Sequence, residues 1–430
     1  MILYIGVLMS LFMDYVRPET YVPVISALKL NSLVPLLTLV FTVFHKGPFD
    51  NPKIFEHSNT RWIIFFMGML VLSVLIADVT EYSYKIFKVV LGFVFWYYMI
   101  TRLFYTLDRI KGVFNVLVFS HILLIILNPK VITNPETRTY ISGNSFLGDG
   151  NDFSLSVCVV IPMCLFLFLD AKKFWLKVVY ALAMMILILG VIGTQSRGAT
   201  LALAAVFLYL WMMGKQKAIG LALIGSIVAV VLNYAPPVYF QRMNTIAHYE
   251  EEGSAMGRII AWKTAIRMVK EYPLTGVGTG HFAVKLGTEF KPPEYGNNNL
   301  PWLTAHSMYF LLIGELGIPG ISFLLAVIIG NYFRNSRCIK LARGSPNPRM
   351  DEYSRLFLML NGSLIAFAVA GAFLSVAYYP HLYVLLGIFT ASHFVFEAAL
   401  KEGGSEQEER KTEWWEDKAE RSVWQDEKQH

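Results

Sequence analysis

The sequence predicts an all-α polytopic membrane protein with about twelve transmembrane helices. Hydrophobic residues make up 55% of the 430 residues and charged residues only 16%, whereas an ordinary soluble domain is roughly 25% charged. The mean hydropathy is +0.49. Apolar runs that suit the roughly 30 Å of a bilayer core recur along the whole chain. So much apolar surface requires lipid as its solvent.

Twelve apolar runs mark the expected helix centres. They are 2–13, 32–44, 62–77, 86–100, 113–127, 153–169, 174–192, 199–213, 218–232, 307–329, 356–376 and 382–399. The first run has no lysine or arginine before it and no small-residue cleavage site, so we expect it to stay as an uncleaved anchor.

The positive residues predict that both termini are cytoplasmic. With a cytoplasmic N-terminus, the inside connections hold Lys46, Lys53, Arg61, Arg102, Arg109, Lys111, Lys172, Lys173, Lys177, Lys215, Lys217, Arg334, Arg337, Lys340, Arg343, Arg349 and Arg355. The short outside connections are poorer in lysine and arginine, as the positive-inside rule requires. Segment 233–305 then lies outside, and its length lets it carry positive residues without contradicting the rule.

The membrane domain is expected to span residues 1–400, followed by a cytoplasmic tail, 401–430, of alternating acids and bases with three tryptophans. This tail is expected to form a solvated or interfacial helix, with docking to a partner as the alternative. The three cysteines are scattered and predict neither a disulfide framework nor a zinc site. Topology explains most of the net charge of +6, so no nucleic-acid partner is expected.

Arg197 lies in a short polar turn between two apolar runs, on the expected outer face. An arginine there runs against the charge bias, and the flanking Ser196 and Gly198 would let an anion approach the backbone closely. A phosphate site is one interpretation. Snorkelling to lipid headgroups or capping of the preceding helix is the other.

Arg258 falls on the apolar face of an amphipathic helix that also carries Trp262, Ala265, Ile266 and Val269. Lys263, Arg267 and Lys270 gather on another side, where we expect them to face water or headgroups. An arginine on an apolar stripe needs a carboxylate or phosphate partner, so a structural salt bridge is the alternative to a ligand site.

His306 stands where the long outer segment re-enters the membrane. Histidine titrates near neutrality and can accept a proton from a hydroxyl, so it is a candidate general base; an ordinary interface histidine is the alternative. Glu315 follows within a run broken by glycines and a proline. A buried acid at membrane depth is a functional candidate, or else it pairs with a cation on a neighbouring helix.

These elements occur in a fixed order: T-Q-S-R-G-A at 194–199, Arg258 with Trp262, Y-P-L-T-G-V-G-T-G-H-F at 272–282, and His306 followed by E-L-G-I-P-G at 315–320. They resemble the O-antigen ligase and polymerase family of bacterial inner membranes, whose pattern is S-R-G, R-x-x-x-W, P-L-x-G-x-G, and H-N followed by E-x-G-x-x-G. The resemblance covers about residues 190–325. Ser307 stands where many relatives have asparagine, a difference that bears on acceptor preference.

The resemblance implies a GT-C-like helical fold and a metal-independent enzyme without cofactors. Such an enzyme takes a glycan from undecaprenyl diphosphate and passes it to a hydroxyl of lipid A core or another glycan, on the periplasmic side of the inner membrane. Membrane lipids are further partners. In this scheme Arg197 and Arg258 bind the diphosphate, His306 orients or deprotonates the acceptor, and Ser196, Glu315 and His281 are supporting candidates. The helical outer loop 233–305 is expected to close over the donor.

Several functions stay open at this point. Family members include O-antigen ligases, which the sequence favours here, polymerases, and protein O-oligosaccharyltransferases, and the motifs are common to all three. A secondary anion transporter that uses Arg197, Arg258 and Glu315 is an alternative from another class, although these charges concentrate on one face instead of at the midplane. A membrane scaffold without catalytic activity is the third class of function, beside the glycosyltransferases and the transporter.

Overall fold

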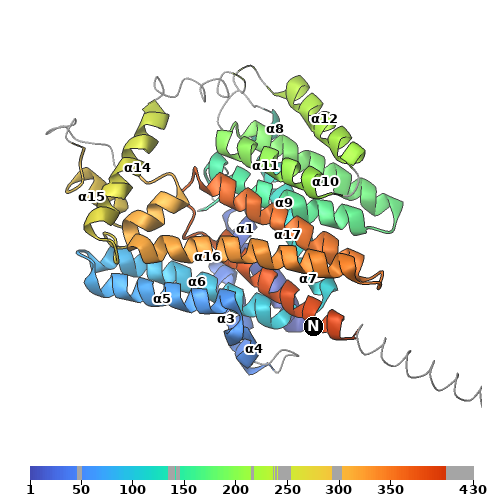
Figure 1. Ribbon diagram of the computed structural model, residues 1–430, viewed down its shortest axis with the longest axis horizontal. Coiled ribbons are helices and arrows are strands. Elements are labelled where there is room, and N and C mark those ends of the chain that lie inside the picture. Colours follow the sequence, from blue (N-terminus) through green and yellow to red (C-terminus); the bar gives the residue numbers. More distant parts are fainter. Residues whose placement is uncertain are drawn as a thin grey trace, which may run out of the picture.

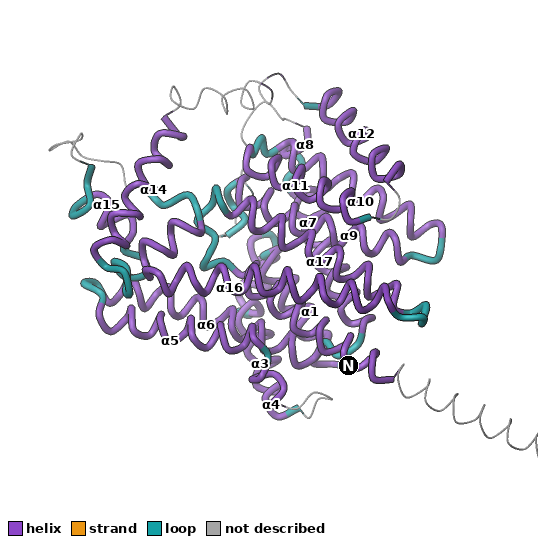
Figure 2. The backbone as a smooth tube through the Cα atoms, in the orientation of Figure 1, coloured by secondary structure: helices purple, strands orange, loops and turns teal. Residues whose placement is uncertain are grey.

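The computed structural model describes residues 1–45, 51–133, 141, 146–214, 217–235, 237, 240, 253–292 and 303–402. Parts of the long outer segment and nearly all of the charged tail lie outside these residues. The described residues form helices and connecting loops, with no strands among them (Figure 2).

The helices follow the chain in the order drawn in Figure 1. They are α1 (Ile2–Val16), η1 (Pro18–Thr20), α2 (Pro23–Ala27), α3 (Leu30–Phe44), α4 (Asn51–Glu56), α5 (Ser58–Ile76), α6 (Thr80–Leu103), α7 (Leu107–Leu127), α8 (Lys130–Thr133), α9 (Gly150–Asp170), α10 (Phe174–Gly193), α11 (Arg197–Met213), α12 (Lys217–Tyr234), α14 (Gly253–Glu271), α15 (Phe282–Gly287), α16 (Met308–Gly344), α17 (Met350–Gly371) and a final helix, Pro380–Glu402. Each predicted apolar run falls on one of these helices, which confirms the all-α membrane fold.

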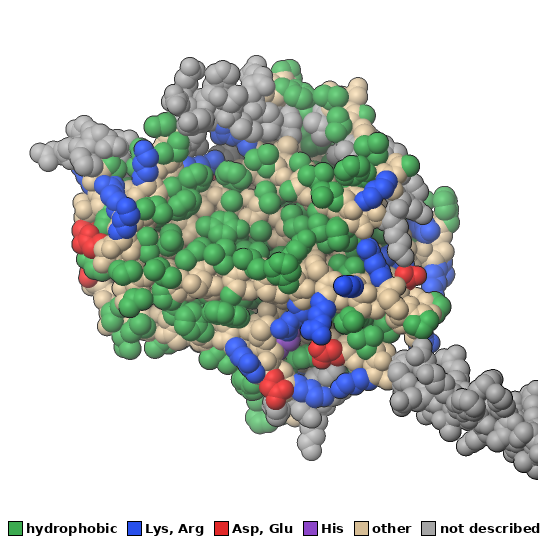
Figure 3. All heavy atoms as spheres, viewed as in Figure 1, with side chains coloured by type: hydrophobic (Ala, Val, Ile, Leu, Met, Phe, Trp, Pro, Cys, Tyr) green, Lys and Arg blue, Asp and Glu red, His purple; other side chains and the backbone are tan. Residues whose placement is uncertain are grey.

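Eight of the described helices are long and apolar enough to cross a membrane: α5, α6, α7, α9, α10, α16, α17 and the final helix. Three shorter apolar helices, α1, α3 and α11, accompany them. Apolar side chains cover the middle of the face in Figure 3, and lysines and arginines gather towards its ends. Leu75 and Phe174 are 76% and 81% exposed, respectively. Such an apolar belt is typical of a lipid-facing surface, so the chain is a multi-pass membrane protein.

Connections predicted to share one side of the membrane contact one another. On the predicted inner side, the ammonium of Lys111 lies 2.7 Å from a carboxylate oxygen of Asp170 and also pairs with Glu352. On the predicted outer side, the hydroxyl of Tyr379 donates to Asp152 at 3.3 Å. This grouping is expected of helices that alternate in direction. Which end faces the cytoplasm stays a prediction.

The helix α16 is interrupted in its first half. Gly317 has φ 66° and ψ −157°, which no helical residue adopts. The next donor, the N–H of Ile318, no longer reaches the carbonyl of Gly314. Pro319 has no N–H, so the carbonyl of Glu315 also lacks its helical donor. Two carbonyls and one amide of α16 therefore need partners from elsewhere.

The loop after α14 supplies these partners. The amides of Val277 and Gly278 donate to the two carbonyls, each at 3.0 Å, and the carbonyl of Pro273 accepts from the α16 amide at 2.8 Å. Gly276 lies against α16 so closely that a Cβ there would be 2.3 Å from the backbone of Glu315. The glycine-rich loop and the broken helix thus form one hydrogen-bonded unit.

We predict that Gly317→Ala lowers the free energy of unfolding by roughly 1–3 kcal/mol, because its backbone conformation is essentially restricted to glycine. A Cβ at this position would also lie 2.4 Å from the carbonyl oxygen of Pro273. Thermal unfolding in detergent, followed by tryptophan fluorescence, measures the effect. Gly330→Ala is the control, since it lies on the same helix with no atom within 4 Å of the new Cβ. Equal midpoints for the two variants would contradict the role given to the break.

Candidate functional site

The turn between α10 and α11 positions Arg197. Gln195 takes a left-handed conformation, with φ 54°, and the chain then enters α11. The hydroxyl oxygen of Ser196 caps the helix by accepting from the amide of Ala199 at 3.4 Å. Arg197 is the first residue of α11 and is half-buried. It therefore stands at the positive end of a helix dipole, where anions are favoured.

The helix α14 presents a buried face made of Ala261, Thr264, Ala265 and Met268. Arg258 lies one turn before this face and is half-buried. Ile266 is exposed, and Arg267 donates to the carbonyl of Phe290 at 2.7 Å. The expectation that Ile266 shares the inner face and that Arg267 faces water or headgroups is therefore wrong. Helical spacing alone missed that a nearby carbonyl draws the guanidinium inward.

The segment that carries His306 runs along α14. The indole N–H of Trp262 donates to the carbonyl of Ala305 at 3.0 Å, and its ring stacks on Phe310 with centroids 5.0 Å apart. His306 is exposed and has φ 45°, an uncommon conformation for a non-glycine residue that the neighbouring contacts must stabilise. Because Arg258 lies one turn before Trp262, the segments bearing Arg258 and His306 are in direct contact.

The end of α17 links these two segments to the turn of Arg197. Met308, at the start of α16, packs on Gly371, where a Cβ would lie 2.5 Å from the methionine sulfur. Just beyond α17, Phe373 packs on Gly198, where a Cβ would lie 3.2 Å from the ring. A Cβ at Gly198 would therefore crowd the ring of Phe373. The three segments with the candidate residues consequently form one chain of contacts.

Glu315 is buried, and each of its carboxylate oxygens has a hydrogen-bond donor. One carboxylate oxygen accepts from the amide of Phe282 at 3.2 Å, and the other accepts from the hydroxyl of Tyr378 at 2.8 Å. These partners are a backbone amide and a phenol. The alternative expected from the sequence was a cation on a neighbouring helix. Glu315 joins the start of α15 and the connection after α17 to the broken part of α16.

His281 is also buried and holds two connections together. Its Nε2 accepts from the amide of Val79 at 3.1 Å, and its Nδ1 donates to the carbonyl of Thr279 at 3.0 Å. These partners are those of a neutral imidazole with its proton on Nδ1. The ring therefore fastens the α5–α6 connection to the glycine-rich loop, as a packing residue.

Sequence reasoning missed the connection after α17. Tyr378 lies between the last two apolar runs, Phe373 lies near the end of the first of these runs, and neither residue belongs to the motifs. The only signal was a cluster of polar and aromatic residues at 378–381, Y-Y-P-H, in an expected outer connection. Their partners lie about 60 to 180 residues away in the chain. No local pattern identifies such contacts.

We predict that Glu315→Gln preserves most of the stability and that Glu315→Ala does not. Alanine leaves the amide of Phe282 and the hydroxyl of Tyr378 without an acceptor, at about 1–3 kcal/mol for each buried group. Glutamine keeps one acceptor oxygen, and its amide can donate to the phenol oxygen. Thermal unfolding of both variants checks this. If glutamine were as damaging as alanine, the negative charge itself would be required.

Residues 182–325 match a family model described as O-antigen ligase. Among curated proteins, none matches the chain significantly. The matched residues hold all the candidates named above: Ser196, Arg197, Arg258, His281, His306 and Glu315. The match supports the O-antigen ligase family and, in general terms, a function of the ligase or polymerase type.

Proposed function

We propose that this chain, with its O-antigen ligase domain at residues 182–325, transfers a glycan from undecaprenyl diphosphate to an acceptor hydroxyl at the periplasmic face of the bacterial inner membrane. The acceptor we favour is lipid A core, which makes the protein an O-antigen ligase. One observation carries the proposal: the three segments that bear Arg197, Arg258 and His306 all lie in the matched region and are linked by contacts.

The reaction breaks the bond between the anomeric carbon and a phosphate oxygen. Negative charge then builds on the departing lipid diphosphate, and fixed positive groups in a partly dehydrated site stabilise it. Arg197 suits this role because it starts α11, where the helix dipole adds to its charge. Arg258 supplies the second guanidinium from α14. The proposal therefore requires no metal ion.

His306 completes the exchange. The acceptor oxygen forms the new bond to the anomeric carbon, and its proton passes to the imidazole. The exposed side chain of His306 can meet an acceptor that arrives from outside the bundle. Its backbone is held between Trp262 and the start of α16, which fixes the position from which the ring projects.

We predict that Arg197→Ala and Arg258→Ala each lower transfer by about 10²–10³-fold, the usual cost of losing one donor to a developing charge. His306→Ala should lower it by about 10²–10⁴-fold. Lys263→Ala is the matched control, because Lys263 is an exposed cation on the same helix as Arg258. Purified protein in nanodiscs, supplied with a lipid-linked glycan, gives the rates.

Lipid A core and a second donor molecule, offered together in this assay, identify the acceptor. Transfer to core establishes a ligase, and elongation of the donor establishes a polymerase. Unchanged transfer in all three variants, with Lys263→Ala as active as they are, would contradict the assignment of these residues. An active wild type that stops on addition of EDTA would contradict metal independence.

A further inference from the structure

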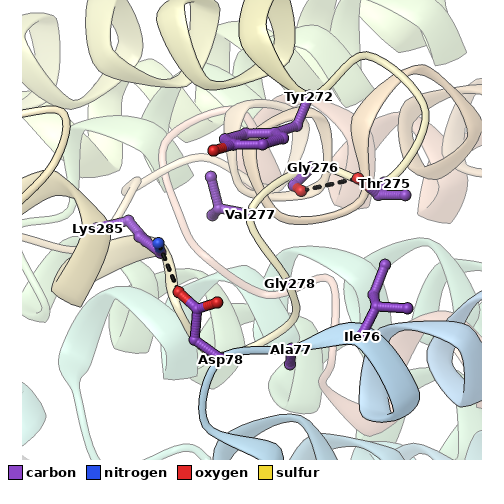
Figure 4. Close-up of a pocket in the computed structure, with 9 residues that line it drawn as sticks. All are labelled: Ile76, Ala77, Asp78, Tyr272, Thr275, Gly276, Val277, Gly278 and Lys285. Atoms are coloured by element: carbon purple, nitrogen blue, oxygen red, sulfur yellow. Dashed lines mark hydrogen bonds and ion pairs between the residues drawn. The ribbon is translucent and has the colours of Figure 1, made fainter.

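A pocket of about 250 Å³ opens between the α5–α6 connection and the loop after α14 (Figure 4). Its lining includes Asp78, Tyr272, Lys285 and the turn 276–278. None of these residues belongs to the proposed transfer site. The turn is the part of the glycine-rich loop that bonds to broken α16, so one wall of the pocket is rigidly held.

The two charged residues that line the pocket, Asp78 and Lys285, form a compact set with the neighbouring Glu289. The ammonium of Lys285 lies 2.6 Å from a carboxylate oxygen of Asp78 and 2.5 Å from one of Glu289. Hydrogen bonds to both carboxylates hold the pKa of the Lys285 ammonium above its ordinary value. Hydrogen bonding from Lys285 holds the pKa of the Asp78 carboxyl below its ordinary value. The set therefore stays ionised near neutral pH, as one cation with two anions.

The excess of carboxylates over ammonium groups determines which class of ligand fits the pocket. An anionic ligand would meet a surplus of negative charge, because both carboxylates already claim the single ammonium. Hydroxyl groups suit the set better, since a carboxylate offers about four acceptor positions and the ion pairs use only part of them. Lys285 keeps a third N–H for a hydroxyl oxygen. The polar part of the pocket thus fits a neutral polyol.

Tyr272 adds an apolar surface beside these groups. Its hydroxyl donates to Glu289 at 3.1 Å, and its ring meets Phe290 edge-on, with centroids 6.3 Å apart. These contacts fix the ring, which lies over the lining residues in Figure 4. A held aromatic ring next to carboxylates matches a pyranose, which has an apolar C–H face and a rim of hydroxyls. The pocket volume suits one sugar ring.

We propose that this pocket is a saccharide subsite that binds one neutral sugar ring of the glycan through Asp78, Lys285 and Tyr272. The proposal rests on the proposed function, because a glycan must be present at this end of the helices. The pocket and His306 both lie at the end where α16 begins, since the loop that forms the pocket wall bonds to the first half of α16. A ring bound here would hold the glycan chain while another part of it reacts.

Direct binding tests the subsite without turnover. The full chain carrying His306→Ala is placed in nanodiscs, and saturation-transfer NMR records its binding of three probes. The first is the glycan released from the lipid-linked donor by mild acid, the second is lipid-free core oligosaccharide, and the third is an oligosaccharide of uronic acids. We expect binding of the first or the second, which tells whether the ring belongs to the donor or the acceptor, and weaker binding of the third.

Asp78→Asn and Tyr272→Ala should each weaken binding about tenfold, the effect of losing a hydrogen bond to a charged group or an aromatic contact. Glu271→Gln is the matched control, because it removes an exposed carboxylate beside Tyr272 that does not line the pocket. The subsite would be overturned if Asp78→Asn and Tyr272→Ala left the affinity unchanged. It would also be overturned if neither of the first two probes bound, or if the uronic acid oligosaccharide bound more tightly than they do. Absence of transfer by wild-type protein, by contrast, would count against the proposed function.

Discussion

The broken backbone of α16 is the constraint on which the rest of the site depends. A helix in lipid must satisfy its own amides and carbonyls, because no water is present to bond them. The conformation of Gly317 and the missing N–H of Pro319 leave two carbonyls without helical donors. The loop after α14 supplies those donors from its own backbone. Moving that loop away would leave these backbone groups unpaired, at a cost of roughly 2–7 kcal/mol each. The glycine-rich loop and the broken part of α16 must therefore stay together.

This unit decides where the candidate residues lie. The loop continues directly from α14, so α14 is held against the first half of α16, and Trp262 can reach the carbonyl of Ala305. Arg258 and the backbone of His306 are therefore set by the same contact. The end of α17 extends the unit to the turn of Arg197, through Met308 and Phe373. Glu315 and His281 support these connections from within, by hydrogen bonds to backbone and phenol groups.

The sequence was sufficient for features that depend on local composition. The twelve apolar runs appear as helices because a membrane span needs a continuous apolar stretch, which is visible without any partner. The order of the motifs likewise can be seen in the chain without knowledge of the fold, and it predicted the match to the O-antigen ligase family model. Contacts between distant segments were out of reach. The partnership of Glu315 with Tyr378 and the inward turn of Arg267 depend on which backbone or side-chain groups come close after folding.

The glycines illustrate the same limit. Their spacing in 272–280 suggested a motif, but the sequence offered no reason for it. The reason is the close approach of Gly276 to the α16 backbone, which becomes evident only when both segments are in place. Likewise, the packing of Phe373 on Gly198 became evident only when both segments were in place, and the approach of an anion to this glycine stays a prediction.

An electron cryomicroscopy structure of the full chain with an undecaprenyl diphosphate glycan bound is the most direct measurement of whether the three segments form one transfer site. We expect the two phosphates to lie within hydrogen-bonding distance of both Arg197 and Arg258, with His306 on the side open to the acceptor and α16 still broken at Gly317. Phosphates bound away from either arginine, or the two arginines on separate faces of the bundle, would contradict a shared site.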